Sequence, residues 1–220
     1  MEEFLGVLFC GGRGTRLGEI TKYISKSLLP VYDVPVFKFG LNSLTVSSRI
    51  NEIIILTNEI NHEILSKEGF TTILQDDSKV NDMFTGWDFI REKTGTEKNA
   101  VLVPSDNICD LNIDELIISF EKNRRDFLFS LYKIKDRKKL SEMGSFDLKE
   151  KRFIYKDPEP KTDYGVIAPY IIRNNFHFNP DNSIFETENS EIFLHNGIWF
   201  DIGDPDTLLN AGLWRQKIKY

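Results

Sequence analysis

The first two thirds of the chain alternate between almost fully apolar runs and segments of mixed character. The apolar runs are FLGVLF at 4–9, NEIIILT at 51–57, NAVLVP at 99–104 and DFLFSLYKI at 126–134. A short, continuous apolar run between polar residues is typical of a strand that is buried on both faces. In residues 35–46 and 113–123 the apolar residues recur instead at helical spacing, which predicts an amphipathic helix in each segment.

This alternation predicts an α/β fold. Strand, helix, strand, helix with nearly fully apolar strands favours a Rossmann-like, mostly parallel mixed sheet with helices on both faces. No repeat, low-complexity segment or Gly/Ser/Pro linker interrupts the 220 residues. We therefore expect residues 1–220 to form a single domain.

The last third of the chain has a different pattern. Residues 145–156 predict a hairpin with KEK at its turn, and residues 163–173 and 195–203 each predict a further strand. From Asp204 onward, acidic residues open a segment with the pattern of a closing helix. These strands would add a β region that walls a substrate-binding pocket.

The charge balance limits the partners that the chain can have. A net charge of -6 argues against general binding to nucleic acid or to an anionic membrane. The basic stretches KNRRD, DRKK and KEKR are short and have acidic neighbours, so we interpret them as solvated surface. No apolar run approaches the roughly 20 residues of a membrane span, and the acidic start MEE is unlike a secretory signal. We expect a cytoplasmic protein.

The cysteines and histidines give no sign of a redox or metal centre. Cys10 and Cys109 are too few for a disulfide framework, and we interpret both as buried thiols. His62, His177 and His195 are scattered without the spacing of metal ligands. We expect the three histidines to be surface or structural residues, and the sequence suggests no Cys/His or Ser/His catalytic pair.

Residues 10–30, CGGRGTRLGEITKYISKSLLP, carry the clearest chemical signal. Three glycines lie within four positions directly after the first predicted strand, and Arg16 and Lys26 follow them. The stretch is neither the G-x-G-x-x-G fingerprint nor a P-loop. Glycines in this place still allow backbone N–H groups to approach phosphate oxygens, and a helical turn after them adds its dipole. The segment therefore predicts a triphosphate site, with Arg16 and Lys26 as its positive charges.

The same stretch resembles a known family. GVLFCGGRGTRLGEITKYISKSLLPVYDVP is similar to the signature of the sugar-1-phosphate nucleotidyltransferases, and most of all to the glucose-1-phosphate thymidylyltransferases, without a gap from Gly11 to Asp33. Three later segments match in the same order: VPSDN around Asp106, YKDPEPKTDYGV around Lys156, and GIWFDIG around Asp201. The resemblance covers nearly the whole chain, and it implies that residues 1–110 mainly bind the nucleotide and residues 111–220 mainly bind the acceptor.

The resemblance also implies roles for single residues. Asp106 and Asp201 each end a hydrophobic stretch, where open α/β sheets bind ligands, and by similarity to the family they would hold Mg²⁺ as the cofactor, a cation that suits carboxylates. Gln75 would read the edge of a pyrimidine base, for which an amide offers one donor and one acceptor. The implied site comprises catalytic residues Arg16, Lys26 and Asp106; nucleotide-binding residues Phe9, Gly11, Gly12, Gly14, Thr15, Arg16 and Gln75; and acceptor-binding residues Gly144, Lys156 and Trp199.

Three departures from the family pattern fall on the groups that choose the substrates. Tyr155 stands where the family has a glutamate, Met143 stands where it has a tyrosine, and residues 76–84 do not align with its base loop. Loss of hydrogen-bonding groups from a pocket built for hydroxyls changes specificity strongly. The reaction class is therefore expected more firmly than the substrates.

The expected reaction joins a nucleoside triphosphate, dTTP or UTP, to a sugar 1-phosphate, giving a nucleotide sugar and pyrophosphate. A cytidylyltransferase acting on another sugar phosphate or on a non-sugar phosphomonoester is the alternative among enzymes. A non-catalytic nucleotide-binding regulatory protein is the alternative outside them. A metal-dependent glycosyltransferase is disfavoured, because the Asp-x-Asp motif is missing around Asp106. Whether the chain forms a homo-oligomer is left open.

Overall fold

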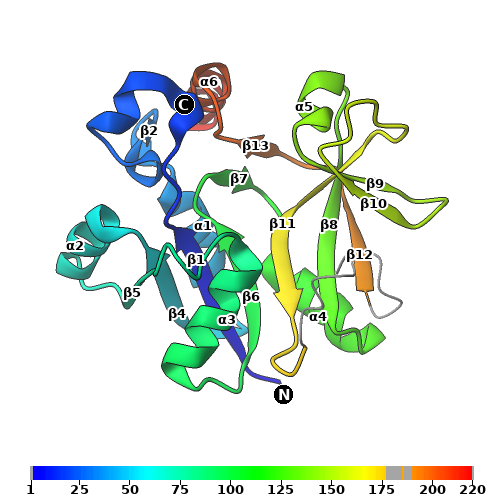
Figure 1. Ribbon diagram of the computed structural model, residues 1–220, viewed down its shortest axis with the longest axis horizontal. Helices are drawn as coiled ribbons and strands as arrows, with labels where there is room; N and C mark the ends of the chain where they lie inside the picture. The colour runs from blue at the N-terminus through cyan, green and yellow to red at the C-terminus, as the bar shows by residue number, and fades with distance from the viewer. Residues whose placement is uncertain (1, 177–184, 186–189, 220) are drawn as a thin grey trace.

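The computed structural model describes residues 2–176, 185 and 190–219 (Figure 1). Its centre is a nine-stranded sheet. Strand β1 (Phe4–Cys10) lies between β4 (Ile50–Thr57) and β6 (Asn99–Pro104), and all three are parallel. Strand β5 (Thr72–Leu74) continues the parallel row beyond β4. The first three predicted strands are confirmed.

Beyond β6 the sheet becomes mixed. Strand β11 (Tyr164–Ile172) runs antiparallel to β6 and to β8 (Phe127–Lys133), and β12 (Ser190–His195) pairs with β8 in parallel. The predicted mostly parallel mixed sheet is therefore confirmed, with β11 as the strand that opposes its neighbours.

Helices cover both faces of this sheet, as the sequence predicts. Helices α1 (Phe37–Thr45), α2 (Glu59–Lys67) and α4 (Ile113–Asn123) pack with one side of β1, and α3 (Met83–Thr94) packs with the other. Because side chains alternate along a strand, Phe4, Leu8 and Cys10 belong to one core cluster while Leu5 and Val7 belong to the second.

Helices α2 and α3 lie in segments for which the sequence analysis proposed no element. Each begins at a side chain that caps its first turn. Asn58 accepts a hydrogen bond from the backbone of Asn61, and Asp82 forms a capping box with Thr85. The cap at Asp82 marks where the segment of residues 76–82 gives way to α3.

The predicted β region of the last third is present, with one correction. The hairpin is confirmed as β9 (Gly144–Asp147) and β10 (Arg152–Tyr155), and β9 pairs with the start of β11. The segment 195–203 is not one strand, and its prediction was wrong. His195 ends β12 in the main sheet, and after a turn β13 (Trp199–Asp201) pairs with β7 (Asn107–Cys109) in a separate antiparallel ribbon.

The remaining elements surround the carboxyl end of the parallel strands (Figure 1). They are the 3₁₀ helices η1 (Thr15–Lys22) and η2 (Lys26–Leu28), the short hairpin of β2 (Pro30–Val31) and β3 (Val34–Pro35), α5 (Arg137–Ser141) and the closing helix α6 (Pro205–Lys219). The predicted closing helix is confirmed, and Asp204 caps it by accepting from the backbone of Thr207 at 2.8 Å. In the described part of the chain, no helix has the length and apolar character needed to cross a membrane.

Candidate active site

The glycine-rich loop leaves the carboxyl end of β1 and lies against the end of β5. A Cβ atom at Gly11 would lie 1.8 Å from Gln75 Oε1, so only glycine allows the loop to pass this amide. Gly14 has a left-handed backbone with φ of 65°, and a Cβ there would lie 2.8 Å from Lys26 Cβ. Gly11 of the loop therefore lies against Gln75, the residue expected to read the base. Gly14 lies against Lys26, the residue expected to act on the phosphates.

After Gly14 the backbone does not form the α-helical turn expected from the sequence. Thr15 and Arg16 open the 3₁₀ helix η1, which Gly18 interrupts with φ of 79°. Both side chains are exposed, and Gly12 has open space where a Cβ would stand. The helix dipole argument is therefore weaker than predicted, while the open glycine backbone remains.

A cleft of about 460 Å³ opens beside this loop. Its walls come from β1, the glycine loop, η2, the end of β5, the loop before α3 and the end of β6. The lining residues are Phe9, Gly11, Gly12, Arg13, Lys26, Ser27, Gln75, Asp77, Val80, Asn81, Asp82, Met83, Pro104, Ser105 and Asp106. Of the nine residues expected to bind the nucleotide or act in catalysis, Phe9, Gly11, Gly12, Lys26, Gln75 and Asp106 line it.

One end of the cleft carries an acidic group that sequence reasoning missed. Asp77 accepts a hydrogen bond from Gln75 Nε2 at 2.6 Å and forms an ion pair with Arg13 at 2.8 Å. The hydrogen bond from Gln75, followed by that from Arg13, lowers the pKa of Asp77, so the group is a carboxylate. This carboxylate fixes the donor side of the Gln75 amide.

The two predicted metal ligands, Asp106 and Asp201, meet at the other end. Asp106 follows β6, and Asp201 ends β13, opposite Asn107 in the β7–β13 ribbon. The Asn107 amide donates to Asp106 at 3.0 Å and to Asp201 at 3.5 Å. The Trp199 indole N–H donates to the oxygen of the same amide at 2.9 Å, which fixes its orientation. The ribbon thus brings together two carboxylates that lie 95 positions apart in the sequence.

The electrostatics of this pair fit a cation. Burial raises the pKa of Asp201, and the nearby Asp106 raises it further. Lys26 is 8% exposed and its ammonium lies 2.5 Å from Asp106 Oδ2. The two carboxylates destabilise each other's charge beside one buried lysine, and hard carboxylate oxygens are the ligands that Mg²⁺ takes.

Two further cations act on the same pair. Lys139 and Arg16 each lower the pKa of Asp201, and Arg16 Nη2 lies 3.0 Å from where a Cβ on Gly203 would be. Lys139 is on α5, with its ammonium 4.6 Å from the centre of the Trp199 ring. The interpretation of DRKK as solvated surface was therefore wrong for Lys139, which is half-buried. Its place could not be foreseen, because only the fold brings α5 to this ribbon.

The predicted acceptor residues lie on the β region. Gly144 opens β9, and a Cβ there would lie 2.5 Å from Phe153 Cε2. Lys156 follows β10 with a left-handed backbone and donates its N–H to the carbonyl of Met143, and its exposed ammonium lies 5.1 Å from the Tyr155 ring. Among the described residues, Lys156 forms no ion pair with the aspartates, so the structure does not bring it to the metal pair directly.

Trp199 and the cysteines complete the set of predicted residues. Trp199 is 9% exposed and packs in the main core, with Asn107 as its polar partner. Cys10 is buried as expected, and burial raises the pKa of its thiol to about 12. Cys109 is half-buried and His195 is buried, and the two lie 3.6 Å apart. Nothing in the sequence indicated that Cys109 and His195 lie close together. His62 is structural, since its Nδ1 lies 3.0 Å from the Thr72 hydroxyl, and His177 lies outside the described residues.

A family model for nucleotidyl transferases matches residues 5–177. The chain belongs to the nucleotidyl transferase family. The resemblance found in the glycine-rich stretch is thereby confirmed at the level of the family, and the cleft and the aspartate pair are its candidate active site.

Curated relatives match this family member over short segments. The glucose-1-phosphate thymidylyltransferase of Actinoplanes sp. is 46% identical over 54 residues, which are 24% of this chain and 18% of the relative. The enzyme of the same name from Neisseria gonorrhoeae is 44% identical over 52 residues, with the same coverage. Translation initiation factor eIF2B subunit gamma of Caenorhabditis elegans is 41% identical over 68 residues, 31% of this chain and 17% of the relative. Each match spans less than a fifth of the relative.

The fold of this nucleotidyl transferase family member has a close counterpart among solved structures. A Bacillus anthracis protein with the provisional name glucose-1-phosphate thymidylyltransferase, crystallised with sucrose, superposes with a TM-score of 0.83. The match covers 99% of this chain and 97% of that chain at 21% identity. At this identity the likeness establishes the α/β fold.

Proposed function

We propose that this chain catalyses nucleotidyl transfer from a nucleoside triphosphate to a sugar 1-phosphate, giving a nucleotide sugar and pyrophosphate. The observation that carries the proposal is the meeting of Asp106 and Asp201 beside Lys26, at the mouth of the glycine-lined cleft. In the reaction, an oxygen of the phosphomonoester attacks the α-phosphorus and pyrophosphate leaves from the opposite side. Such a reaction needs positioning and charge neutralisation rather than a nucleophilic side chain.

The positions of the cations suggest how the charge is neutralised. Backbone N–H groups of Gly11, Gly12 and Gly14 would hold the phosphates, since a glycine has no side chain to block their approach. Arg16 is exposed beside the cleft, and its guanidinium would neutralise the leaving pyrophosphate. Lys26 is buried and fixed on Asp106, so it would orient that carboxylate and add positive charge beside the α-phosphate.

The aspartate pair would hold Mg²⁺, which would neutralise phosphate oxygens when it is bound. Asn107 donates to both carboxylates and would keep their oxygens oriented. Trp199 would act on this arrangement through Asn107, in addition to any contact with the sugar that the family resemblance implies.

Residues at the two ends of the site suggest which base and which acceptor would bind. Gln75 at the cleft wall supports a pyrimidine triphosphate, dTTP or UTP, and the acceptor would lie toward Gly144, Lys156 and Trp199. Asp77 is the residue that could change this choice. It accepts one N–H of the Gln75 amide, whose oxygen lies against Gly11, and so restricts how the amide can turn toward a base. Cytosine presents an amino donor where uracil and thymine present a carbonyl, so the orientation of the amide would decide between these bases. A cytidylyltransferase is therefore the second candidate.

The experiment that tests the proposal measures pyrophosphate release with Mg²⁺ present. It uses a grid of dTTP, UTP, CTP, ATP and GTP against hexose 1-phosphates and other phosphomonoesters, with Asp106→Asn as the inactive control. We expect release that needs both a pyrimidine triphosphate and a hexose 1-phosphate. Release with CTP alone would favour the second candidate.

A binding-only role has one observation in its favour, since one of the similar proteins has the name of a translation factor subunit rather than a transferase. Arg16, Lys26, Asp106 and Asp201 are nevertheless all present in this chain. Triphosphate binding by calorimetry without release across the whole grid would refute the catalytic proposal and support the binding role.

A further inference from the structure

Three side chains of metal-binding type meet at the far end of the β7–β13 ribbon. Cys109 ends β7, Asp110 follows it, and His195 ends β12. Cys109 Sγ lies 3.6 Å and Asp110 Oδ1 lies 3.1 Å from His195 Nε2, and the three ligand atoms all lie within 4.8 Å of one another. Two separate parts of the chain therefore bring sulfur, oxygen and nitrogen ligands to one point.

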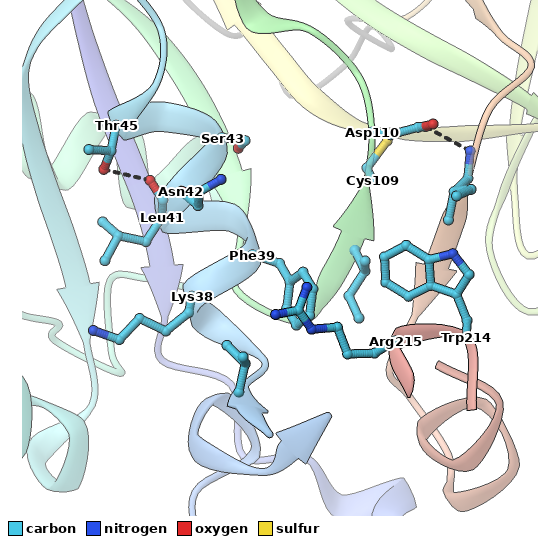
Figure 2. Close-up of a pocket in the computed structure, with 13 residues that line it drawn as sticks. Lys38, Phe39, Leu41, Asn42, Ser43, Thr45, Cys109, Asp110, Trp214 and Arg215 are labelled. Atoms are coloured by element: carbon cyan, nitrogen blue, oxygen red, sulfur yellow. Dashed lines mark hydrogen bonds between the residues drawn. The ribbon is translucent and has the colours of Figure 1, made fainter. Parts of the chain in front are cut away.

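The cluster borders a pocket that is distinct from the nucleotide cleft. Figure 2 shows Cys109 and Asp110 beside each other at the end of β7, with Asp110 pointing toward the segment before β13. Both residues line a pocket together with residues of α1 and α6. This pocket of about 470 Å³ shares no described lining residue with the nucleotide cleft. Asp106 and Asp201 do not line it, so the cluster is separate from the proposed Mg²⁺ site.

The geometry does not fit thiol catalysis. In a Cys–His–acid arrangement the acid holds the ring nitrogen opposite to the one that faces the thiol. Here Cys109 and Asp110 both approach Nε2 of His195. Burial also raises the pKa of the Cys109 thiol to about 12, whereas a nucleophilic thiol needs a lowered pKa. The group is thus not a catalytic triad.

Hydrogen bonding alone does not explain why three groups lie close to Nε2 of His195. The carbonyl of Ile198 also lies 3.1 Å from this nitrogen, so sulfur, carboxylate and carbonyl surround an atom that carries at most one proton. The backbone N–H of Ile198 donates to Asp110 Oδ1 at 2.7 Å, which holds the carboxylate in place. In a metal site the ligand side chains point toward one position, and hydrogen bonds from neighbouring groups hold them in that orientation. The cluster has this arrangement.

We propose that Cys109, Asp110 and His195 bind a tetrahedral transition-metal cation, with Zn²⁺ as the preferred ion. Zinc bond lengths of about 2.3 Å to sulfur and about 2.0 Å to nitrogen or oxygen place such ligands roughly 3.3–3.6 Å apart. The distances of 3.6 Å and 3.1 Å to Nε2 are close to these separations. A thiolate and an imidazole select zinc over Mg²⁺, which prefers oxygen ligands alone.

The site would act as a clamp on the β7–β13 ribbon. Cys109 is paired with Trp199 across the ribbon, and two residues along the same strands Asn107 is paired with Asp201. A cation that joins Cys109 and Asp110 to the end of β12 would therefore hold the ribbon that carries the aspartate of the proposed active site. Three protein ligands leave one position of the ion for water or for a ligand from the pocket.

The test titrates the metal-free protein with Co²⁺ alone, which reports a thiolate ligand by a sulfur-to-cobalt charge-transfer band and a tetrahedral site by its strong visible bands. We expect one such Co²⁺ per chain, displaced by Zn²⁺ and not by Mg²⁺. Cys109→Ser should lose the charge-transfer band. His195→Gln and Asp110→Asn should weaken binding by at least the roughly 10–100-fold that loss of an outer partner costs.

Matched variants separate this site from general thiol or histidine effects. Cys10→Ser and His62→Gln each remove the same kind of group elsewhere and should keep the band. Zn²⁺ should raise the melting temperature of the wild type and of His62→Gln, and not that of His195→Gln, with circular dichroism confirming that each variant is folded. No charge-transfer band, a band that survives in Cys109→Ser, or binding that Mg²⁺ displaces would each overturn the proposal. None of these readouts depends on nucleotidyl transfer.

Discussion

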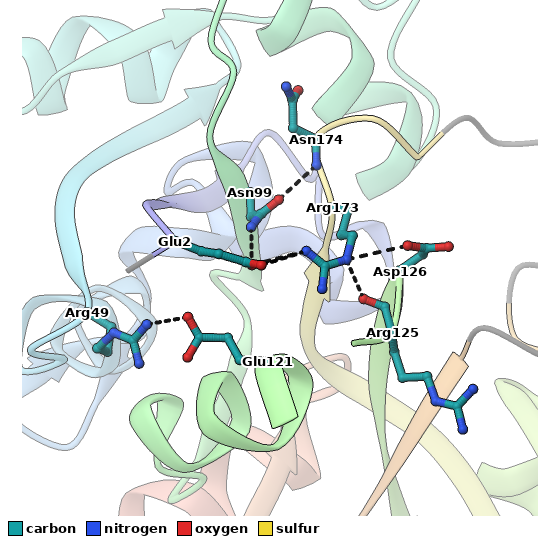
Figure 3. A network of polar contacts seen from close by, with 8 residues as sticks. All are labelled: Glu2, Arg49, Asn99, Glu121, Arg125, Asp126, Arg173 and Asn174. Atoms are coloured by element: carbon teal, nitrogen blue, oxygen red, sulfur yellow. Dashed lines mark hydrogen bonds and ion pairs between the residues drawn. The ribbon is translucent and has the colours of Figure 1, made fainter. Parts of the chain in front are cut away.

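Charged side chains gather at both ends of the central sheet, and the two ends use them in opposite ways. At the amino end, shown in Figure 3, Arg173 pairs with Glu2 at 2.9 Å and Arg49 pairs with Glu121 at 2.5 Å. The Asn99 amide also donates to Glu2 at 2.8 Å. At the carboxyl end, the nearby Asp106 adds to the rise in the pKa of Asp201 that burial causes, and the buried Lys26 is paired with Asp106.

The difference separates charges that hold the fold from charges that are kept for a ligand. At the amino end, Glu2 before β1 and Asp126 before β8 are both paired with Arg173 after β11, and Arg49 before β4 is paired with Glu121 of α4, so opposite charges tie these segments together. At the carboxyl end the like charges are brought together by a ribbon, at a cost in stability that a bound cation would offset. Changes at the carboxyl end should therefore affect activity, and changes at the amino end should affect stability.

The largest effect is expected from Asp201→Asn. We expect the rate of pyrophosphate release to fall by about 10³-fold, because an oriented metal ion contributes several kcal/mol to the transition state. Without Mg²⁺, the free energy of unfolding should stay the same or rise, since the variant removes one of two neighbouring like charges. Urea unfolding and release assays on the same samples check both results.

Asp126→Asn, the same substitution at the amino end, is the matched control and should keep the rate within about twofold. Asp126 lies 3.4 Å from Arg173 just before β8, and it is not among the residues that line the cleft. Equal losses of activity in the two variants would contradict the division between the ends.

The opposite pattern is expected for Arg173→Met. The Arg173 side chain is 19% exposed, donates to the carbonyl of Arg125 at 2.7 Å and lies 4.9 Å from the Phe120 ring. Its loss should lower the free energy of unfolding by about 2 kcal/mol, since hydrogen bonds to charged groups contribute about 1.5–3 kcal/mol and exposure reduces this. The rate well below the melting temperature should be unchanged. Arg152→Met, at an exposed arginine of β10, should have little effect on either quantity.

A smaller effect sharpens the account of the carboxyl end. Trp199→Phe keeps an aromatic ring in the core and removes the N–H that holds Asn107. Loss of one hydrogen bond of about 1 kcal/mol should lower kcat by roughly fivefold if Asn107 orients the aspartates. Trp214→Phe, on α6 beside Phe39, is the control. A rise in KM for the sugar phosphate with kcat unchanged would show that Trp199 acts on the acceptor alone.

The smallest effect concerns the choice of base. Asp77→Ala frees the Gln75 amide to turn, and we expect the preference between CTP and UTP to change by a few-fold while the best rate is kept. Asp76→Ala is the neighbouring control, because Asp76 accepts from Ser78 and not from the amide. An unchanged preference in Asp77→Ala would mean that this carboxylate does not set the orientation of Gln75.

The sequence predicted the sheet and the separate parts of the site, and it missed the contacts between them. Apolar runs such as 4–9 and 99–104 are local signals of strands. A motif that directly follows such a run can therefore be placed at the end of a strand. Asp106 and Asp201 were identified in this way. Asn107 adjoins Asp106 in SDN and could have been noticed, but its bond to Asp201 depends on the β7–β13 register.

The errors have the same origin. The segment 195–203 has one apolar pattern, yet a turn after His195 divides it between two sheets. That division brings His195 to Cys109, 86 positions away, and no spacing rule detects such a pair. The burial of Lys139 was missed because this residue lies in a basic run, and a helix of five residues has too few positions to show which of its sides is buried.

The most direct test of the central claim follows the α-phosphorus. The protein is incubated with Mg²⁺, a hexose 1-phosphate and the preferred pyrimidine triphosphate labelled at its α-phosphate, and the products are separated. The account predicts that the label appears in a nucleotide sugar, in equal amount to unlabelled pyrophosphate, and that Asp201→Asn forms neither. Label in nucleoside monophosphate or on the protein, or unchanged triphosphate with the wild type, would contradict it.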